Sequence, residues 1–283
     1  MRDVRSFPVF RRPGKDATDD EELISPGSEC EAAMDFFDPR WPVFYLDNHL
    51  LVLHKPAGLL VQGDRTGDVC LLDLARHWIK MRYGKPGRVF LGVVHRLDRP
   101  VAGVMVFGRT SKSAARLSEQ FRVGRVRKRY LAVVEGRLQN DQGRLEHGIL
   151  RSGQRSKIVR LDTPGSQFAG LSYRCLAGSG RRSLVEIDLE TGRHHQIRLQ
   201  FSHIGHPVVG DLRYGAPAPL PRKQIALLSR SIAFDHPTLR EPLEFTCPLP
   251  AGWLWPEGPS IAPEVVWNWS DTEPARRPFP LSG

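Results

Sequence analysis

The sequence predicts an α+β fold built on a largely antiparallel sheet. At 283 residues, with 40% hydrophobic and 25% charged residues, the chain has the size and composition of a globular protein with a full core. Segments with strand character outnumber segments with helical periodicity, and they do not alternate regularly with helices as in a parallel α/β sheet. No apolar run reaches the roughly 18 residues of a membrane helix, so none is expected.

Three segments show helical spacing. In 71–81, apolar residues recur at intervals of three and four, namely Leu71, Leu74, Ala75, Trp78 and Ile79. A second helix is expected over 111–121, with Thr110 or Ser111 as its N-cap. The third is expected over 194–204, after the break at Thr191–Gly192.

Strands are expected where β-branched and aromatic residues cluster or alternate with polar ones. In one such segment, Val185, Ile187 and Leu189 alternate with acidic residues, which is typical of a half-buried strand. The expected strands are 43–46, 50–54, 103–107, 130–134, 185–189, 225–234 and 243–246.

The chain divides into three parts by composition. Residues 1–40 mix charge, Pro and Gly without a period and predict an irregular N-terminal arm, whereas 41–255 carry the ordered pattern and 256–283 form a Pro-rich tail. The four cysteines form no CxxC pair, and the N-terminus lacks the apolar core of a secretory signal. We therefore expect a cytoplasmic protein, and we expect it to be a monomer.

The charge balance favours a polyanionic partner. Lys and Arg total 41 against 31 Asp and Glu, which gives a net charge of +10 and a pI near 9.8. Basic residues are densest between 116 and 129, where Arg122, Arg125 and Arg127 are candidates for phosphate contacts. A solvated basic face is the alternative for this run.

The most informative segment runs from His95 to Pro100. Here Asp98 lies between Arg96 and Arg99 in a Pro-terminated loop, just before an apolar strand. Nearby positive charges favour the ionised carboxylate, and an ionised carboxylate held in place can act as a nucleophile. From these residues alone, however, a salt bridge within the loop is the better explanation.

Four further segments accompany this loop and favour a catalytic role for Asp98 over a salt bridge. They are LHKPAGL at 53–59, KRY at 128–130, ETGRHHQIR at 190–198, and GHP with GD and YG at 205–215. With HRLD at 95–98, their order and spacing resemble the signature of the RluA-type RNA pseudouridine synthases, over roughly 41–248. The resemblance implies the pseudouridine synthase fold, a mixed and largely antiparallel sheet flanked by helices with a central catalytic cleft.

The resemblance also implies a reaction and its residues. A uridine of rRNA or tRNA is turned out of the RNA stack, its glycosidic bond is broken, and uracil is reattached through C5. Asp98 would attack the nucleotide, Arg96 would fill the space that the base leaves, and Tyr130 would stack on the flipped ring. Arg198 would pair with Asp98 through a bidentate guanidinium.

Two further residues are expected to bind substrate, and no cofactor is expected. His95 and Lys128 are the two, although His95 could instead hydrogen bond to the loop backbone. The isomerisation has no redox or group-transfer step that needs a cofactor. A metal is not expected either, because adjacent histidines such as His194 and His195 would point about 100° apart on a helix.

Two departures from the family and two other functions bear on this interpretation. Val101–Ala102–Gly103 stands where the family usually has Thr-Ser-Gly, and residues 1–40 are too short for the S4 RNA-binding domain that many relatives carry.

A non-catalytic RNA-binding protein with the same fold is the alternative, but Asp98, Tyr130 and Arg198 are all present. A glycoside hydrolase would need two facing carboxylates. The sequence does not predict which uridine is modified.

Overall fold

The computed structural model describes residues 43–249, apart from 65, 154 and 222–223. The expected N-terminal arm and Pro-rich tail lie outside these residues. The helical elements are α2 (Leu71–Arg82), α3 (Ser111–Arg122), α4 (Gln196–His203) and the short 3₁₀ helix η1 (Leu212–Tyr214). The strands are β1 (Val43–Leu46), β2 (Leu50–Lys55), β3 (Gly92–Val93), β4 (Ala102–Gly108), β5 (Arg127–Glu135), β6 (Gln142–Ser152), β7 (Arg155–Val159), β8 (Gln167–Gly178), β9 (Arg182–Leu189), β10 (Leu227–Asp235) and β11 (Pro242–Thr246).

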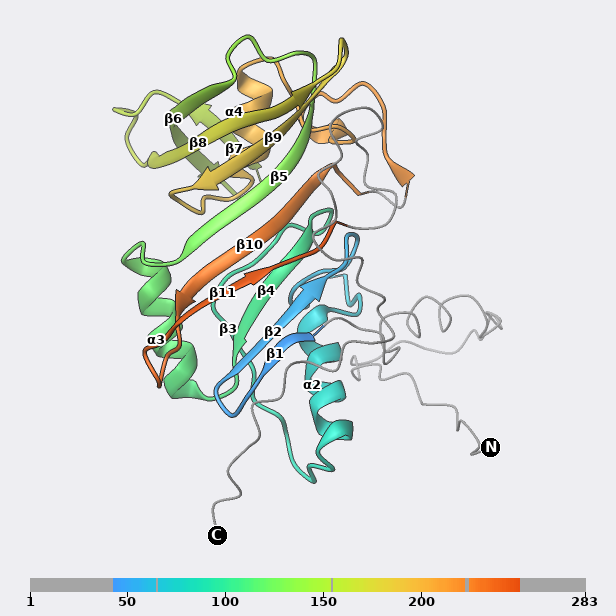
Figure 1. The fold of residues 1–283 in the computed structure, drawn as a ribbon, viewed down its shortest axis with the longest axis vertical. Coiled ribbons are helices and arrows are strands. Elements are labelled where there is room, and N and C mark those ends of the chain that lie inside the picture. The colour runs from blue at the N-terminus through green and yellow to red at the C-terminus, as the bar shows by residue number, and fades with distance from the viewer. Residues whose placement is uncertain (1–42, 65, 154, 222–223, 250–283) are drawn as a thin grey trace, which may run out of the picture.

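All eleven strands belong to one mixed sheet. Its order is β1-β2-β4-β10-β5-β9-β8-β6-β7, with β3 on β4 and β11 on β10 (Figure 1). Among the described strands, only β4 and β10 run parallel, and the remaining pairs are antiparallel. The α+β architecture predicted from the sequence is therefore confirmed.

Helices cover both faces of the sheet around β2 and β4. Leu51 and Leu53 pack with α2 in one hydrophobic cluster, whereas Leu50 and Val52 pack with Leu117 of α3 in another. Because side chains alternate along a strand, β2 and β4 are apolar on both sides and form nearly continuous apolar runs in the sequence. No helix in the described part of the chain is long and apolar enough to cross a membrane.

The expected helices and strands are confirmed, with ends that differ by up to three residues. Thr110 caps α3, its hydroxyl accepting a hydrogen bond from the Ser113 backbone N–H at 3.0 Å. The third helix starts at Gln196 rather than 194, because His195 has a left-handed conformation with φ of 57°. The sequence did not predict β6, β7 and β8, whose many polar residues and glycines obscure the alternation.

One row of residues crosses the centre of the sheet. Lys55 of β2 is in register with Gly103 of β4, Gly103 with Ser229 of β10, and Ser229 with Tyr130 of β5. Gly103 has a φ of 131°, and a Cβ there would lie 2.3 Å from the Ser229 carbonyl oxygen. The close approach of β4 to β10 therefore requires glycine.

The departure from the family at 101–102 is accommodated by packing. Val101 is 2% exposed and belongs to the main hydrophobic cluster, while Ala102 is half-buried against the cluster around α3. Both side chains thus anchor the segment that follows Asp98 by apolar contacts rather than by hydroxyl hydrogen bonds.

We predict that Gly103→Ala lowers the free energy of unfolding by about 2 kcal/mol or more, because the added methyl collides with the β10 backbone. Urea denaturation measures the change. Gly63→Ala is the matched control, since a Cβ at Gly63 meets no atom within 4 Å. Equal stabilities of the two variants would contradict the close packing of β4 on β10.

Candidate active site

Asp98 lies in the loop between β3 and β4 and is held there by its neighbours. Leu97 and Val101 are both buried, and the Val101 N–H donates to the Asp98 carbonyl oxygen at 3.0 Å to close a turn. The Asp98 side chain remains 25% exposed. The loop is therefore fixed on both sides of a carboxylate that solvent can still reach.

Lys55 ties this loop to the segment after β2. Its fully buried ammonium donates to the carbonyl oxygens of Pro56 (2.9 Å), Leu59 (2.7 Å) and Arg99 (3.2 Å). Gly58 N–H donates to the same Arg99 oxygen at 2.8 Å. Burial lowers the pKa of Lys55 to about 7, although the negative charge of Asp98 opposes this shift. The sequence showed Lys55 only as part of a motif, without this role.

Arg198 of α4 joins two carboxylates. Its Nη1 donates to Asp98 Oδ2 at 2.9 Å, while Nε and Nη2 donate to the two oxygens of Asp211 at 2.6 and 2.9 Å. The expected pairing with Asp98 is present, but the bidentate contact is with Asp211, so the expected bidentate Asp98 pair is wrong. Burial disfavours the charged guanidinium, yet these hydrogen bonds and charges outweigh it and raise the pKa of Arg198.

His195 forms a second contact with Asp98. Its Nε2 lies 3.5 Å from Asp98 Oδ2, and its Nδ1 lies 2.7 Å from the hydroxyl oxygen of Tyr214. Burial lowers the pKa of His195 to about 3, so the ring is neutral at physiological pH. The Tyr214 ring also covers Arg198, 4.9 Å from the guanidinium carbon.

The two adjacent histidines do not lie on a helix as expected. His194 and His195 precede α4, and their rings stack with centroids 3.8 Å apart and planes 19° apart. The expectation that they would diverge by a helical angle is wrong. Within the described residues, no group of three or more His, Cys, Asp or Glu side chains is placed to hold a metal ion.

Tyr130 lies on β5, in register with Ser229 at the centre of the sheet. The side chain is buried, and burial raises the pKa of Tyr130 to about 12, with a further increase from the charge of Asp98. The phenol therefore stays protonated at neutral pH. The charge of Asp98, on the loop before β4, therefore reaches the phenol of Tyr130 on β5.

The two basic neighbours of these residues differ in exposure. Arg96 is exposed beside Asp98 on the loop. Lys128 is half-buried two residues before Tyr130, hence on the same side of β5, and its Nζ lies 3.6 Å from where a Cβ of Gly192 would be. Burial and the charge of Arg193 lower the pKa of Lys128 to about 8.

His95 is turned into the protein. Its Nε2 accepts a hydrogen bond from the Val106 N–H of β4 at 3.1 Å, and its ring stacks on Phe121 of α3 at 4.9 Å. Burial lowers the pKa of His95 to about 3. His95 thus hydrogen bonds to the backbone, as the alternative for it supposed, but to strand β4 rather than to its own loop.

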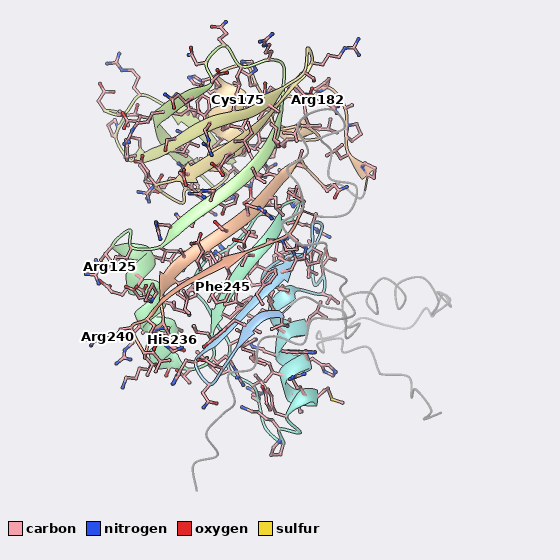
Figure 2. All side chains as sticks on the ribbon, in the orientation of Figure 1. Arg125, Cys175, Arg182, His236, Arg240 and Phe245 are labelled. Atoms are coloured by element: carbon pink, nitrogen blue, oxygen red, sulfur yellow. The ribbon has the colours of Figure 1, made fainter. Side chains whose placement is uncertain are left out.

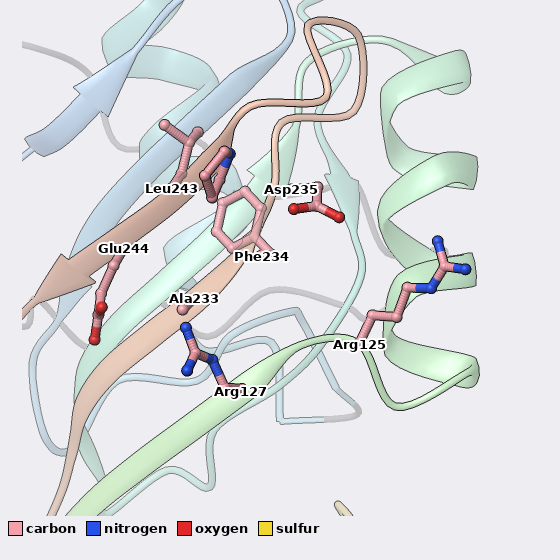
Figure 3. A pocket seen from close by; sticks show the side chains of 8 residues that line it. Arg125, Arg127, Ala233, Phe234, Asp235, Leu243 and Glu244 are labelled. Atoms are coloured by element: carbon pink, nitrogen blue, oxygen red, sulfur yellow. The ribbon is translucent and has the colours of Figure 1, made fainter.

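The basic run before Tyr130 has acidic neighbours. Arg122 pairs with Glu119 at 2.6 Å, and Arg129 with Asp188 at 3.2 Å. Arg125 and Arg127 line a shallow pocket of about 210 Å³ together with Asp235 and Glu244, over an apolar floor from β10 and β11 (Figure 3). These carboxylates offset much of the positive charge that the run presents to a polyanion.

Sequence reasoning left four residues of this site without a role, namely Lys55, His195, Asp211 and Tyr214. Each lies inside one of the segments that carried the resemblance, and membership of those segments was the sequence feature that could have pointed to these residues. Their roles were hidden because they depend on contacts between segments far apart in the chain, such as Arg198 with Asp211.

Comparisons with known proteins identify the family of this chain. Residues 49–203 match the RNA pseudouridylate synthase family. The ribosomal large subunit pseudouridine synthase D of Pseudomonas aeruginosa is 33% identical over 235 residues, covering 77% of this chain and 71% of the relative. The dual-specificity RNA pseudouridine synthase RluA of Haemophilus influenzae is 32% identical over 211 residues, covering 74% and 93%.

A solved structure gives the same result for the fold. Human RNA pseudouridylate synthase domain containing 4 superposes with a TM-score of 0.63 at 26% identity, covering 74% of this chain and 88% of that one. Because the family match alone spans more than half of the sequence, this chain belongs to the RNA pseudouridylate synthase family.

Proposed function

We propose that this protein isomerises specific uridines of rRNA or tRNA to pseudouridine, with Asp98 as the nucleophile and with the target base flipped out of the RNA. The observation that carries the proposal is the setting of Asp98. One carboxylate oxygen, Oδ2, accepts from Arg198 and lies near His195, while the described residues make no hydrogen bond to Oδ1. A fixed carboxylate with one unengaged oxygen suits attack on a nucleotide.

The other residues take their roles from their positions around Asp98. The Tyr130 ring is proposed to stack on the flipped uracil, and exposed Arg96 to fill the space that the base leaves in the RNA. Lys128 is proposed to contact the nucleotide electrostatically, since its half-buried ammonium lies on the same side of β5 as Tyr130. His95 and Lys55 are proposed to position the loop.

The proposed setting of the reaction is the cytoplasm. The three cysteines of the described residues, Cys70, Cys175 and Cys247, are free thiols, in keeping with a reducing compartment. The proposed enzyme acts as a monomer, and residues 41–255 are proposed as its catalytic domain.

The proposed function is tested by mapping pseudouridines in total RNA from cells with and without the gene. A site that disappears with the gene, and returns with the wild-type copy but not with Asp98→Asn, would identify the substrate. An unchanged modification pattern would overturn the proposal and favour a non-catalytic RNA-binding protein.

We predict that Asp98→Asn lowers turnover by at least about a thousandfold while RNA affinity and folding are retained. The substitution is isosteric and removes only the nucleophilic charge. Tritium release from 5-labelled uridine in RNA measures turnover, and a binding titration measures affinity. Asp162→Asn, an exposed acid paired with Arg160, is the matched control and should be fully active. Substantial turnover by Asp98→Asn would remove Asp98 from the mechanism.

We predict that Arg198→Lys lowers kcat by about tenfold or more, because one ammonium cannot replace the three donors that Asp98 and Asp211 receive. Single-turnover rates on saturating RNA measure the change, and circular dichroism checks the fold. Arg160→Lys, at the exposed pair with Asp162, is the control and should match the wild type. Wild-type kcat in Arg198→Lys would show that the planar guanidinium is not needed to hold Asp98.

A further inference from the structure

A second set of basic residues lies next to Asp98, on the side of α4. Its centre is His194, whose Nδ1 lies 2.9 Å from the Ser156 hydroxyl oxygen of β7 and whose ring stacks on His195. His195 in turn reaches Asp98 at 3.5 Å. The half-buried His194 ring is therefore held in place, with the His195 ring between it and the proposed nucleophile Asp98.

Arg151 flanks His194 on one side. It is in register with Ser156 across the β6–β7 hairpin, so both side chains project from the same face of the hairpin, the face that contacts His194. The side chain is exposed, and only its Nε is engaged, by the Gly153 carbonyl oxygen at 3.0 Å. Within the described residues Arg151 makes no ion pair, and its charge lowers the pKa of His194.

Arg213 lies near the same pair of stacked histidines, next to Tyr214. It belongs to η1, and its guanidinium lies over the Tyr214 ring at 5.9 Å. Tyr214 contacts His195, on which His194 is stacked, and the charge of Arg213 also acts on His194. Two exposed arginines from separate elements, Arg151 of β6 and Arg213 of η1, therefore lie near the stacked rings of His194 and His195.

This arrangement differs from the basic run at 122–129. There, acidic side chains accompany the arginines, and Arg125 lies at the end of α3, far from the part of the sheet that carries α4 (Figures 1 and 2). Among the described residues whose charge acts on His194, the one carboxylate is Asp98, which also pairs with Arg198.

We propose that Arg151 and Arg213, near the stacked rings of His194 and His195, bind a backbone phosphate of the substrate RNA next to the flipped nucleotide. The proposal rests on the proposed function, because it needs RNA in the Asp98 site. Guanidinium groups suit a phosphate because their planar donors match its oxygens, and the fixed rings nearby limit how the backbone can lie. Such contacts set the register of the RNA without entering the reaction.

The test compares two double variants that each remove two positive charges. Arg151→Gln/Arg213→Gln should raise KM on the order of tenfold and leave kcat within about twofold. The slope of log affinity against log salt should fall by about 0.7 to 0.9 for each phosphate that the variant no longer binds. The matched control, Arg160→Gln/Arg174→Gln, also removes two exposed guanidinium groups and should keep the wild-type KM and slope. The probe is RNA extracted from cells that lack the gene, and thermal melting checks folding.

Two results would overturn the inference. One is a wild-type KM and salt slope in the Arg151/Arg213 variant, and the other is an equal loss in the control, which would reflect net charge alone. Binding of the same RNA is also measured with both pairs of substitutions in the Asp98→Asn background, where no turnover is needed. If the wild-type protein forms no pseudouridine but its RNA affinity still depends on Arg151 and Arg213, the proposed function is wrong while the proposed phosphate site stands.

Discussion

The two halves of the sheet are joined by one short parallel contact, and the site depends on it. β1, β2 and β4 lie on one side, and β10, β5 and the remaining long strands lie on the other. In register, β4 meets β10 only through Ala102 with Leu228 and Gly103 with Ser229. The Asp98 loop enters β4 at this point, and Tyr130 is next to Ser229 in the same row. A shift of this contact would therefore separate the carboxylate from the aromatic ring proposed to act with it.

Arg198 completes the connection from the other half of the sheet. Its side chain is 6% exposed, and that of Asp211 is 2% exposed, so their bidentate pair is almost without solvent. Removing one partner of such a pair leaves a buried, unpaired charge and costs about 3–5 kcal/mol of stability, so the guanidinium is strongly held in this position. Asp211 thus fixes the guanidinium by accepting from Nε and Nη2 of Arg198. Nη1 of Arg198 donates to Asp98, across the boundary between the two halves of the sheet.

Local chemistry explains what the sequence could and could not predict. The apolar runs of β2 and β4 and the capped helix α3 follow from propensity and periodicity. The loop of Asp98 was identified by the order and spacing of the segments that resemble the family, because its own residues favoured a salt bridge. β6 to β8 escaped notice because their exposed, Gly-containing strands resemble loops. The double role of Arg198 and the inward turn of His95 depend on partners far away in the chain, and no local pattern contains them.

The shared guanidinium has a consequence for which parts of a nucleotide can enter. Asp98 and Asp211 together carry two negative charges against the single positive charge of Arg198, and His195 is neutral, so these four side chains together carry a net negative charge. Lys55 donates to the backbone oxygens of Pro56, Leu59 and Arg99 rather than to any of the four, and Arg151 is exposed on β6. If Asp98 acts as proposed, this group repels a phosphodiester but not an uncharged uracil ring. Its charge would then favour the base over the RNA backbone next to Asp98.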